Sequence, residues 1–180
     1  MLEDERLILR IRCGDRDALR RLYEKHRNRL LTVAASLVND MGAAEDVVHD
    51  VFMTFAAGIH KYRLYGSLVN YLTTCVVNRV RDKIRKKKFE MVEVDRFDLL
   101  SSDSVGPEKS AIFDEQSQML ADALAKIPFE QREVIVLHLQ GQMKFREIAS
   151  SQGVSLSTAQ ARYRYGLEKL RSILNPEVVQ

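Results

Sequence analysis

Hydrophobic residues recur every three or four positions in three stretches of the first 90 residues. The stretches cover about residues 17–38, 43–59 and 68–84. This spacing places the apolar side chains of each stretch on one face of an amphipathic helix. The expected core positions are Leu19, Leu22, Tyr23, His26, Leu30, Val33, Ala34 and Leu37, then Ala44, Val47, Val48, Val51, Phe52, Phe55 and Ile59, then Leu68, Leu72, Cys75, Val76, Val80 and Ile84. Three such helices can bury a common core, so residues 1–90 are predicted to form one helical domain.

The periodicity fails after residue 90 and resumes near residue 113. Between these points Ser, Asp, Gly and Pro occur in the proportions of a loop, so residues 91–112 are predicted to be a flexible linker. Helical patterns return in "FDEQSQMLADALAKI" and, after Pro128, in "EQREVIVLHL". No stretch is a convincing strand. The predicted fold is therefore all-α, with two small helical domains, 1–90 and 113–176, joined by a flexible acidic linker.

The second domain contains a helix-turn-helix pattern at "FREIASSQGVSLSTAQARYRYGLEKLR", residues 145–171. Gly153 allows the left-handed backbone of a tight turn, and Ser155 is the expected N-cap of the second helix. Helical hairpins with a glycine turn are common, so the pattern alone does not distinguish a DNA-reading helix from two packed helices. That choice depends on the rest of the chain.

Composition narrows the class of protein. Hydrophobic residues make up 46% of the chain and charged residues 29%, as in a soluble globular protein, and only 8 Gly and 3 Pro are present, which suits helices. No apolar run approaches the roughly 20 residues of a membrane span, and the N-terminal "MLEDERLILRIR" is too charged for a secretory signal. Cys13 and Cys75 lack a metal-site spacing and are expected to be reduced thiols. We therefore expect a cytoplasmic protein without membrane insertion.

Charge is distributed unevenly along the chain, although the net charge is only +3. Residues 1–90 hold 18 Lys and Arg against 12 Asp and Glu, whereas residues 91–115 hold 2 against 7, and residues 116–180 hold 8 against 6. Two basic segments are thus separated by an acidic one. This pattern fits two modules that face nucleic acid, joined by a segment that avoids it.

Three segments, read in order, resemble one protein family. They are "AEDVVHDVF", "YGSLVNYLTTCVVNRVRDKIR" and, after the acidic linker, "ALAKIPFEQREVIVLHLQGQMKFREIASSQGVSLSTAQARYRYGLEKLR". Together they resemble the two domains of an extracytoplasmic-function (ECF) sigma factor, over about residues 15–90 and 115–172. Each segment is a weak signal alone, but their order and spacing make the combination specific.

The resemblance implies a function. In this family the first domain grips the clamp of core RNA polymerase and opens the minus-ten promoter element, the second reads the minus-thirty-five element, and the linker passes through the polymerase interior. The expected partners are core RNA polymerase and promoter DNA, and an anti-sigma protein is a further partner that the family allows.

The resemblance also implies site residues in the first domain. The polymerase contact falls on Glu45, Asp46, His49 and Asp50, although the spacing alone favours a solvated acidic face. Minus-ten recognition and strand opening fall on Tyr62, Tyr65, Tyr71, Asn78, Arg79, Arg81, Lys83 and Arg85. Aromatic rings can stack on unpaired bases while a basic face follows the phosphates, but tyrosines of this kind are as often packing residues.

In the second domain the implied minus-thirty-five contacts lie on the second helix of the helix-turn-helix. They are Ser155, Ser157, Thr158, Gln160, Ala161, Arg162, Arg164 and Tyr165. Gln can bind adenine through two hydrogen bonds, Arg can bind guanine, and the Ala methyl can meet the thymine methyl. The helix-turn-helix is therefore interpreted as a DNA reader.

Other functions fit less well. The chain has no phosphate-binding loop, no dinucleotide-binding turn and no metal-ligand constellation, so we expect neither an enzyme nor a cofactor. A helix-turn-helix regulator that never joins polymerase is the main alternative, and it would need a dimerisation or ligand-binding domain. A recombinase would need a second, nucleophile-bearing motif, and none is found in the sequence.

Overall fold

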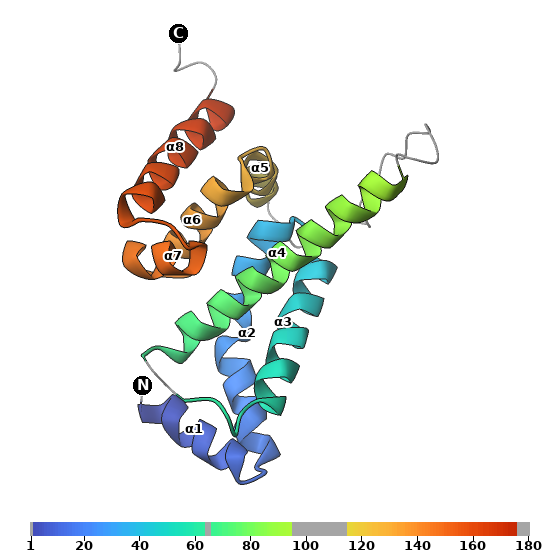
Figure 1. The fold of residues 1–180 in the computed structure, drawn as a ribbon, viewed down its shortest axis with the longest axis vertical. Helices are drawn as coiled ribbons and strands as arrows, with labels where there is room; N and C mark the ends of the chain where they lie inside the picture. The colour runs from blue at the N-terminus through green and yellow to red at the C-terminus, as the bar shows by residue number, and fades with distance from the viewer. Residues whose placement is uncertain (1, 64–65, 95–114, 176–180) are drawn as a thin grey trace.

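The computed structural model describes residues 2–63, 66–94 and 115–175, which form eight helices and contain no strand (Figure 1). The all-α prediction is confirmed. Most of the predicted linker lies outside the described residues. The helices are α1 (Leu2–Arg12), α2 (Arg16–Val38), α3 (Met41–Ala57), α4 (Leu68–Val94), α5 (Glu115–Ala125), α6 (Phe129–Leu139), α7 (Phe145–Gln152) and α8 (Leu156–Leu174).

Helices α2, α3 and α4 pack together as a bundle around the predicted apolar stripes. Asp15 and Asp40 begin α2 and α3 as N-caps, since each carboxylate accepts a hydrogen bond from the backbone N–H three residues on. Asn39 ends α2 in the left-handed conformation with φ of 54°. A cap, a turn residue and a second cap thus explain why the chain reverses between α2 and α3.

Helix α1 was not predicted from the apolar periodicity. It crosses the end of the bundle (Figure 1) and buries Leu7, Ile8 and Ile11 against the same core. Its last residue, Arg12, donates hydrogen bonds to backbone carbonyls of the segment between α3 and α4. The first helix therefore contacts the segment that carries Tyr62, one of the predicted strand-opening tyrosines.

Helix α4 is longer than the sequence suggested. It continues to Val94, past the predicted end of the first domain, and its last turns extend beyond α3 in Figure 1. Ile84 was expected in the core but is 39% exposed. The apolar stripe loses its packing partners where α4 extends past the rest of the bundle.

Helices α5 to α8 form the second group, and α6 lies at its centre. Five consecutive residues of α6, Glu133 to Leu137, are buried, and the last four of them are apolar. Ile135 packs with α5 and α8, whereas Val134, Val136 and Leu137 join the same apolar core as the bundle. A helix that is apolar on all sides in this way must be covered from several directions. The two helical groups are therefore packed against each other, with α6 facing α2.

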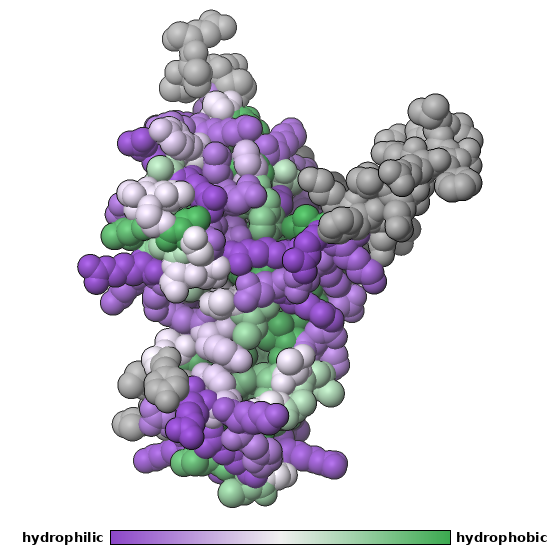
Figure 2. All heavy atoms as spheres, viewed as in Figure 1, coloured by the Kyte–Doolittle hydropathy of each residue, from purple (hydrophilic) through white to green (hydrophobic). Residues whose placement is uncertain are grey.

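The face of the molecule drawn in Figure 2 is mostly polar. Figure 2 shows a face on which hydrophilic residues predominate, with hydrophobic residues visible in smaller areas between them. No helix in the described part of the chain is both long and apolar enough to cross a membrane.

Candidate nucleic-acid and polymerase interfaces

The helix-turn-helix is formed by α7 and α8. Gly153 ends α7 with φ of 65°, which is the left-handed conformation expected from the sequence. Ser155 caps α8, because its Oγ accepts the Thr158 N–H at 3.1 Å. The hydroxyls of Ser157 and Thr158 each lie 2.8 Å from the same oxygen. These polar groups gather at the exposed N-terminus of α8, where backbone N–H groups and the helix dipole favour a phosphate.

Most of the predicted base readers on α8 face solvent. Gln160, Arg164 and Tyr165 are exposed, and Ala161 is half-buried. The Arg164 guanidinium lies over the Tyr165 ring at 4.9 Å from its centroid, so these two side chains form one surface. Gln160 and Arg164 are four residues apart and project from the same side of the helix.

Arg162 differs from the other predicted DNA contacts on α8. It is half-buried and donates a hydrogen bond of 2.8 Å to Gln152 Oε1 on α7. Gln152 in turn donates to the Glu130 carbonyl of α6 at 3.1 Å. This chain of bonds ties α6, α7 and α8 together, so Arg162 holds the hairpin in shape.

The acidic face of α3 is paired with basic residues of the neighbouring helices. Glu45 contacts Arg27 of α2 at 3.2 Å, and Asp46 lies 3.8 Å from Lys83 of α4. His49, between these acids and Asp50, is exposed.

The closest of these pairs joins Asp50 and Arg79 at 2.6 Å. The hydrogen bond and charge of Arg79 hold the pKa of the Asp50 carboxyl below its usual value, and the charges of Lys83 and His49 act in the same direction. Two predicted polymerase-binding acids, Asp46 and Asp50, and two predicted DNA-binding cations therefore neutralise one another in the free chain. All three α3 pairs are well exposed, and exposed pairs contribute only about 0–1 kcal/mol, so a partner can displace them at low cost.

Four of the eight residues predicted for minus-ten recognition and strand opening line one open pocket between α3 and α4. Tyr62, Tyr71, Asn78 and Arg79 all line it. The Tyr62 ring stands edge-on to Phe55, with centroids 5.1 Å apart, and lies 4.7 Å from the Tyr71 ring.

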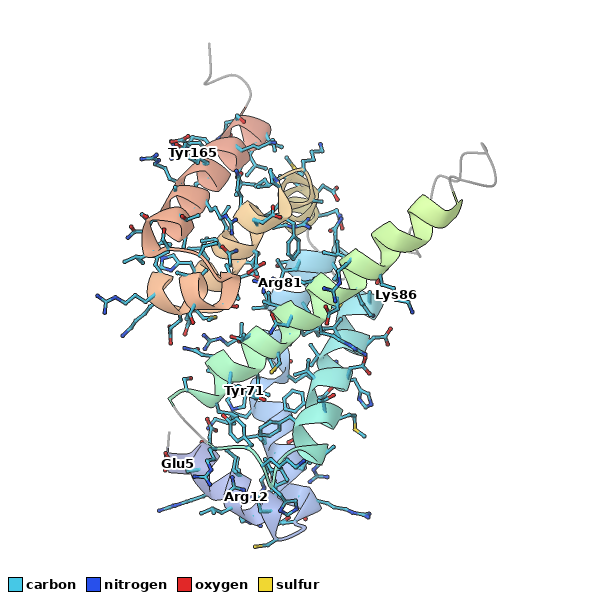
Figure 3. The ribbon with its side chains drawn as sticks, viewed as in Figure 1. Glu5, Arg12, Tyr71, Arg81, Lys86 and Tyr165 are labelled. Carbon is cyan, nitrogen blue, oxygen red and sulfur yellow. The ribbon has the colours of Figure 1, made fainter. Side chains whose placement is uncertain are left out.

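Burial raises the pKa of Tyr62 to about 12 and also raises the pKa of Tyr71. Tyr71 is nevertheless 43% exposed, so its ring remains accessible (Figure 3). The two tyrosines are both packing residues and part of the pocket wall. Tyr65 lies outside the described residues.

Arg81 faces the C-terminal helices (Figure 3). Its guanidinium bonds the two Glu133 carboxylate oxygens at 3.0 and 2.5 Å, and one of its nitrogens donates to the Ser151 carbonyl and to Asn78 Oδ1, both at 3.0 Å. Glu133 is 1% exposed, and sequence reasoning missed it. A single acid inside the apolar run "EVIVLHL" was the available signal, because a buried charge needs a partner.

The other two cations of α4 that were predicted to contact DNA, Lys83 and Arg85, also have nearby partners. Lys83 lies 3.5 Å from the Ala43 carbonyl in addition to its contact with Asp46. Arg85 is exposed and pairs with Asp82 at 2.8 Å on the same helix. No group of His, Cys, Asp and Glu suited to a metal ion occurs among residues 2–63, 66–94 and 115–175.

Comparison with known proteins finds two sigma-70 regions, in the order expected from the sequence. The sequence model of sigma-70 region 2 matches residues 22–90, and that of sigma-70 region 4 matches residues 117–170. The RNA polymerase sigma factor CarQ of Myxococcus xanthus is 28% identical over 165 residues, which cover 92% of this chain and 94% of CarQ. The ECF RNA polymerase sigma factor SigW of Bacillus subtilis is 24% identical over 176 residues, covering 93% of this chain and 94% of SigW.

Two solved structures share the fold. The sigma factor RpoE in complex with the anti-sigma factor NepR from Bartonella quintana has a TM-score of 0.73 at 22% identity, covering 88% of this chain and 97% of RpoE. CnrH in complex with the cytosolic domain of CnrY has a TM-score of 0.68 at 22% identity, covering 97% of this chain and 99% of CnrH. Two sigma-70 regions in order, with relatives that span almost the whole chain, show that this protein belongs to the ECF sigma factors of RNA polymerase.

Proposed function

We propose that this sigma factor reads the minus-thirty-five element with the exposed face of α8. We further propose that it opens the minus-ten element at the open pocket between α3 and α4 that Tyr62 and Tyr71 line, here called the tyrosine pocket. As a member of its family it is an initiation factor that binds core RNA polymerase and gives it promoter specificity. The observation that carries the assignment is the solvent-facing pair Gln160 and Arg164 on a capped helix within the region 4 match.

Base reading by α8 follows from the donors that this face offers. Gln160 can make two hydrogen bonds to an adenine and Arg164 can make two to a guanine, and each good pair discriminates against a wrong base by about 1–3 kcal/mol. The free N–H groups at Ser155 would hold a phosphate and set the register of the helix in the major groove. Arg171 is exposed near the far end of α8 and is assigned to a phosphate.

Strand opening needs a new stacking surface for the base that leaves the duplex. Tyr62 and Tyr71 supply aromatic faces at the pocket, and Asn78 supplies an amide beside them. Stacking on an aromatic side chain stabilises an unpaired base by about 1–3 kcal/mol. Arg79 borders the same pocket, and the phosphates would compete with Asp50 for its guanidinium.

Polymerase binding is assigned to the outer face of α3, through Glu45, Asp46, His49 and Asp50. Three of these are acids whose partners are exposed cations of α2 and α4. A basic clamp surface could take over these carboxylates and release Arg79 and Lys83 for DNA. We assign no catalytic step to the chain, and we place it in the cytoplasm with the polymerase.

An anti-sigma protein is a further proposed partner. The structurally similar RpoE was solved with the anti-sigma factor NepR, and CnrH with the cytosolic domain of CnrY. This proposal is supported by the shared fold of the two neighbours.

The decisive experiment is promoter selection with the purified chain and core RNA polymerase. From a randomised upstream element, Gln160→Ala and Arg164→Ala should each relax the preference at one base position, because the lost contact is to a base edge. Arg171→Ala is the matched control on the same helix, and it should weaken all sequences alike and reduce the salt dependence of binding. Unchanged base preference in both reader variants would show that this face of α8 does not read DNA.

A further inference from the structure

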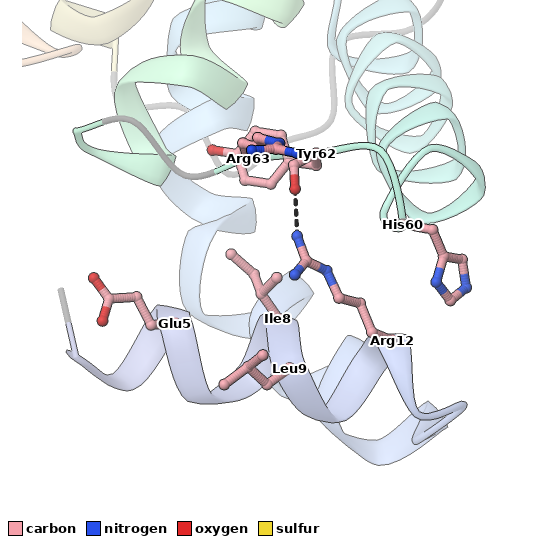
Figure 4. A pocket seen from close by; sticks show the side chains of 7 residues that line it. All are labelled: Glu5, Ile8, Leu9, Arg12, His60, Tyr62 and Arg63. Atoms are coloured by element: carbon pink, nitrogen blue, oxygen red, sulfur yellow. Dashed lines mark hydrogen bonds between the residues drawn. The ribbon is translucent and has the colours of Figure 1, made fainter.

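Arg12 connects the first helix to the loop between α3 and α4. It is the last residue of α1, and it precedes the segment matched by sigma-70 region 2. Its guanidinium points from α1 into a pocket lined by Glu5, Ile8, Leu9, His60, Tyr62 and Arg63 (Figure 4). There Nε donates to the Ile59 carbonyl at 3.2 Å, and Nη2 donates to the Tyr62 carbonyl.

These two bonds fix a segment that has little regular structure. Lys61 and Tyr62 donate their N–H groups to the Gly58 carbonyl at 2.9 and 3.1 Å, which forms a short turn after α3. Arg12 joins two carbonyls of this turn that are three residues apart. A guanidinium is a planar fork that is always charged, so it can hold both acceptors in one geometry.

Tyr62 stands between two hollows of the protein. Tyr62 lines the pocket against α1, where Arg12 lies. It also lines the open pocket that contains Tyr71, Asn78 and Arg79. The ring packs against Phe55 and Tyr71 in the second pocket. Any displacement of the Tyr62 backbone on the α1 side therefore moves an aromatic ring on the α4 side.

We propose that Arg12 is a positioning residue for promoter opening: it holds the backbone of Tyr62 so that the ring is presented to the unpaired base. The inference rests on the proposed role of the tyrosine pocket and adds α1 to it. An aromatic ring stabilises a displaced base most when it is already in place, because ordering the loop as the base arrives would cost free energy.

The test uses the full chain with core RNA polymerase and measures the rate of open-complex formation on a duplex promoter and on a template already melted at the minus-ten element. Arg12→Ala removes both hydrogen bonds to the turn and should slow opening of the duplex by about tenfold or more, since the loss of one charge-assisted hydrogen bond already corresponds to that factor. The defect should be largely relieved on the melted template, and core binding should not change. Arg6→Ala is the matched control, because Arg6 is exposed on the same helix, and it should behave as the unchanged protein.

Arg12→Lys provides a second variant if the alanine variant folds poorly. A primary amine keeps the charge and can donate to the same carbonyls without the fork, so opening should fall between that of the unchanged protein and that of Arg12→Ala. A merely less stable protein would lose the same fraction of activity on both templates.

Action through Tyr62 is tested by combining substitutions. If Arg12 acts by positioning this ring, Tyr62→Phe/Arg12→Lys should combine additively because the ring remains, whereas Tyr62→Ala/Arg12→Lys should be no slower than Tyr62→Ala alone. Normal duplex opening by both Arg12 variants, or an additive loss with Tyr62→Ala, would overturn the inference. If Tyr62→Ala itself opens DNA normally, the inference falls together with the proposed tyrosine pocket. Failure of the unchanged chain to direct promoter-specific transcription with core RNA polymerase would instead overturn the proposed function.

Discussion

Replacing Arg81 by leucine should destabilise the protein far more than the same change at Arg79, two residues away on α4. Both arginines were predicted to contact DNA, and both form an ion pair in the structure. The Glu133 partner of Arg81 is 1% exposed, whereas the Asp50 side chain that pairs with Arg79 is 44% exposed. Only the first substitution leaves a carboxylate buried without a cation.

The magnitude follows from this difference in burial. Removing one member of a buried ion pair costs about 3–5 kcal/mol, and the 30% exposure of the Arg81 side chain places this pair at the lower end, about 3 kcal/mol. Arg79→Leu should cost less than about 1 kcal/mol, as expected for an exposed pair. Glu133→Leu should be intermediate, about 1–2 kcal/mol, since Arg81 keeps its bonds to Ser151 and Asn78 and its contact with water.

A double-mutant cycle measures the pair directly. Urea unfolding of the unchanged protein, Arg81→Leu, Glu133→Leu and the double variant should give a coupling free energy of about 2 kcal/mol, because the double variant buries no unpaired charge. Small-angle scattering of the same samples should report an expansion for Arg81→Leu, as the pair joins α4 to α6. A coupling below about 0.5 kcal/mol, with equal effects of Arg79→Leu and Arg81→Leu, would refute the buried pair.

Two further predictions concern the stability of the fold. Burial lowers the pKa of His26 below its ordinary value of 6.5, against the opposing charge of Asp4, so the unfolded chain takes up a proton first as the pH falls. The free energy of unfolding, measured by urea titration, should therefore decrease between about pH 7.5 and about pH 5.5. His26→Leu should make this pH dependence weaker. An equal pH dependence in the variant would show that other groups cause it. Gly141→Ala should destabilise the protein by about 1–3 kcal/mol, because the new Cβ would lie 2.5 Å from the Leu137 carbonyl oxygen. Gly58→Ala is the control, since a Cβ there meets only contacts of 3.4 Å or more. Thermal unfolding compares the two variants, and equal midpoints would contradict the steric argument.

Amphipathic periodicity predicted the bundle well because α2 and α3 each bury one continuous stripe. All seven core positions expected on α3 and its following turn are buried, including Ile59 at 3% exposure. Helix α1 escaped the same reasoning because its buried apolar side chains span only one turn. Leu7, Ile8 and Ile11 stand among six charged residues, so the stripe is one turn long.

The candidate site was predictable where it depends on local geometry. The turn at Gly153 and the cap at Ser155 are set by a few neighbouring residues, and these determine where α8 begins. The buried ion pair is not local in this sense. Arg81 and Glu133 are 52 residues apart in sequence, and a charge pattern cannot show which cation a buried acid will meet.

The cations predicted to contact DNA thus divide according to what must be given up to release them. Freeing Arg79 or Lys83 breaks an exposed pair with α3, which costs less than about 1 kcal/mol, and one phosphate contact can compensate for it. Freeing Arg81 leaves Glu133 buried and unpaired unless α6 moves away from α4. A phosphate contact by Arg81 therefore requires the two helical groups to separate, whereas contacts by Arg79 and Lys83 do not. DNA binding by the free chain, in which the two helical groups are packed together, should for this reason depend on Arg79 and Lys83. It should depend on Arg81 only when the two groups have separated on polymerase.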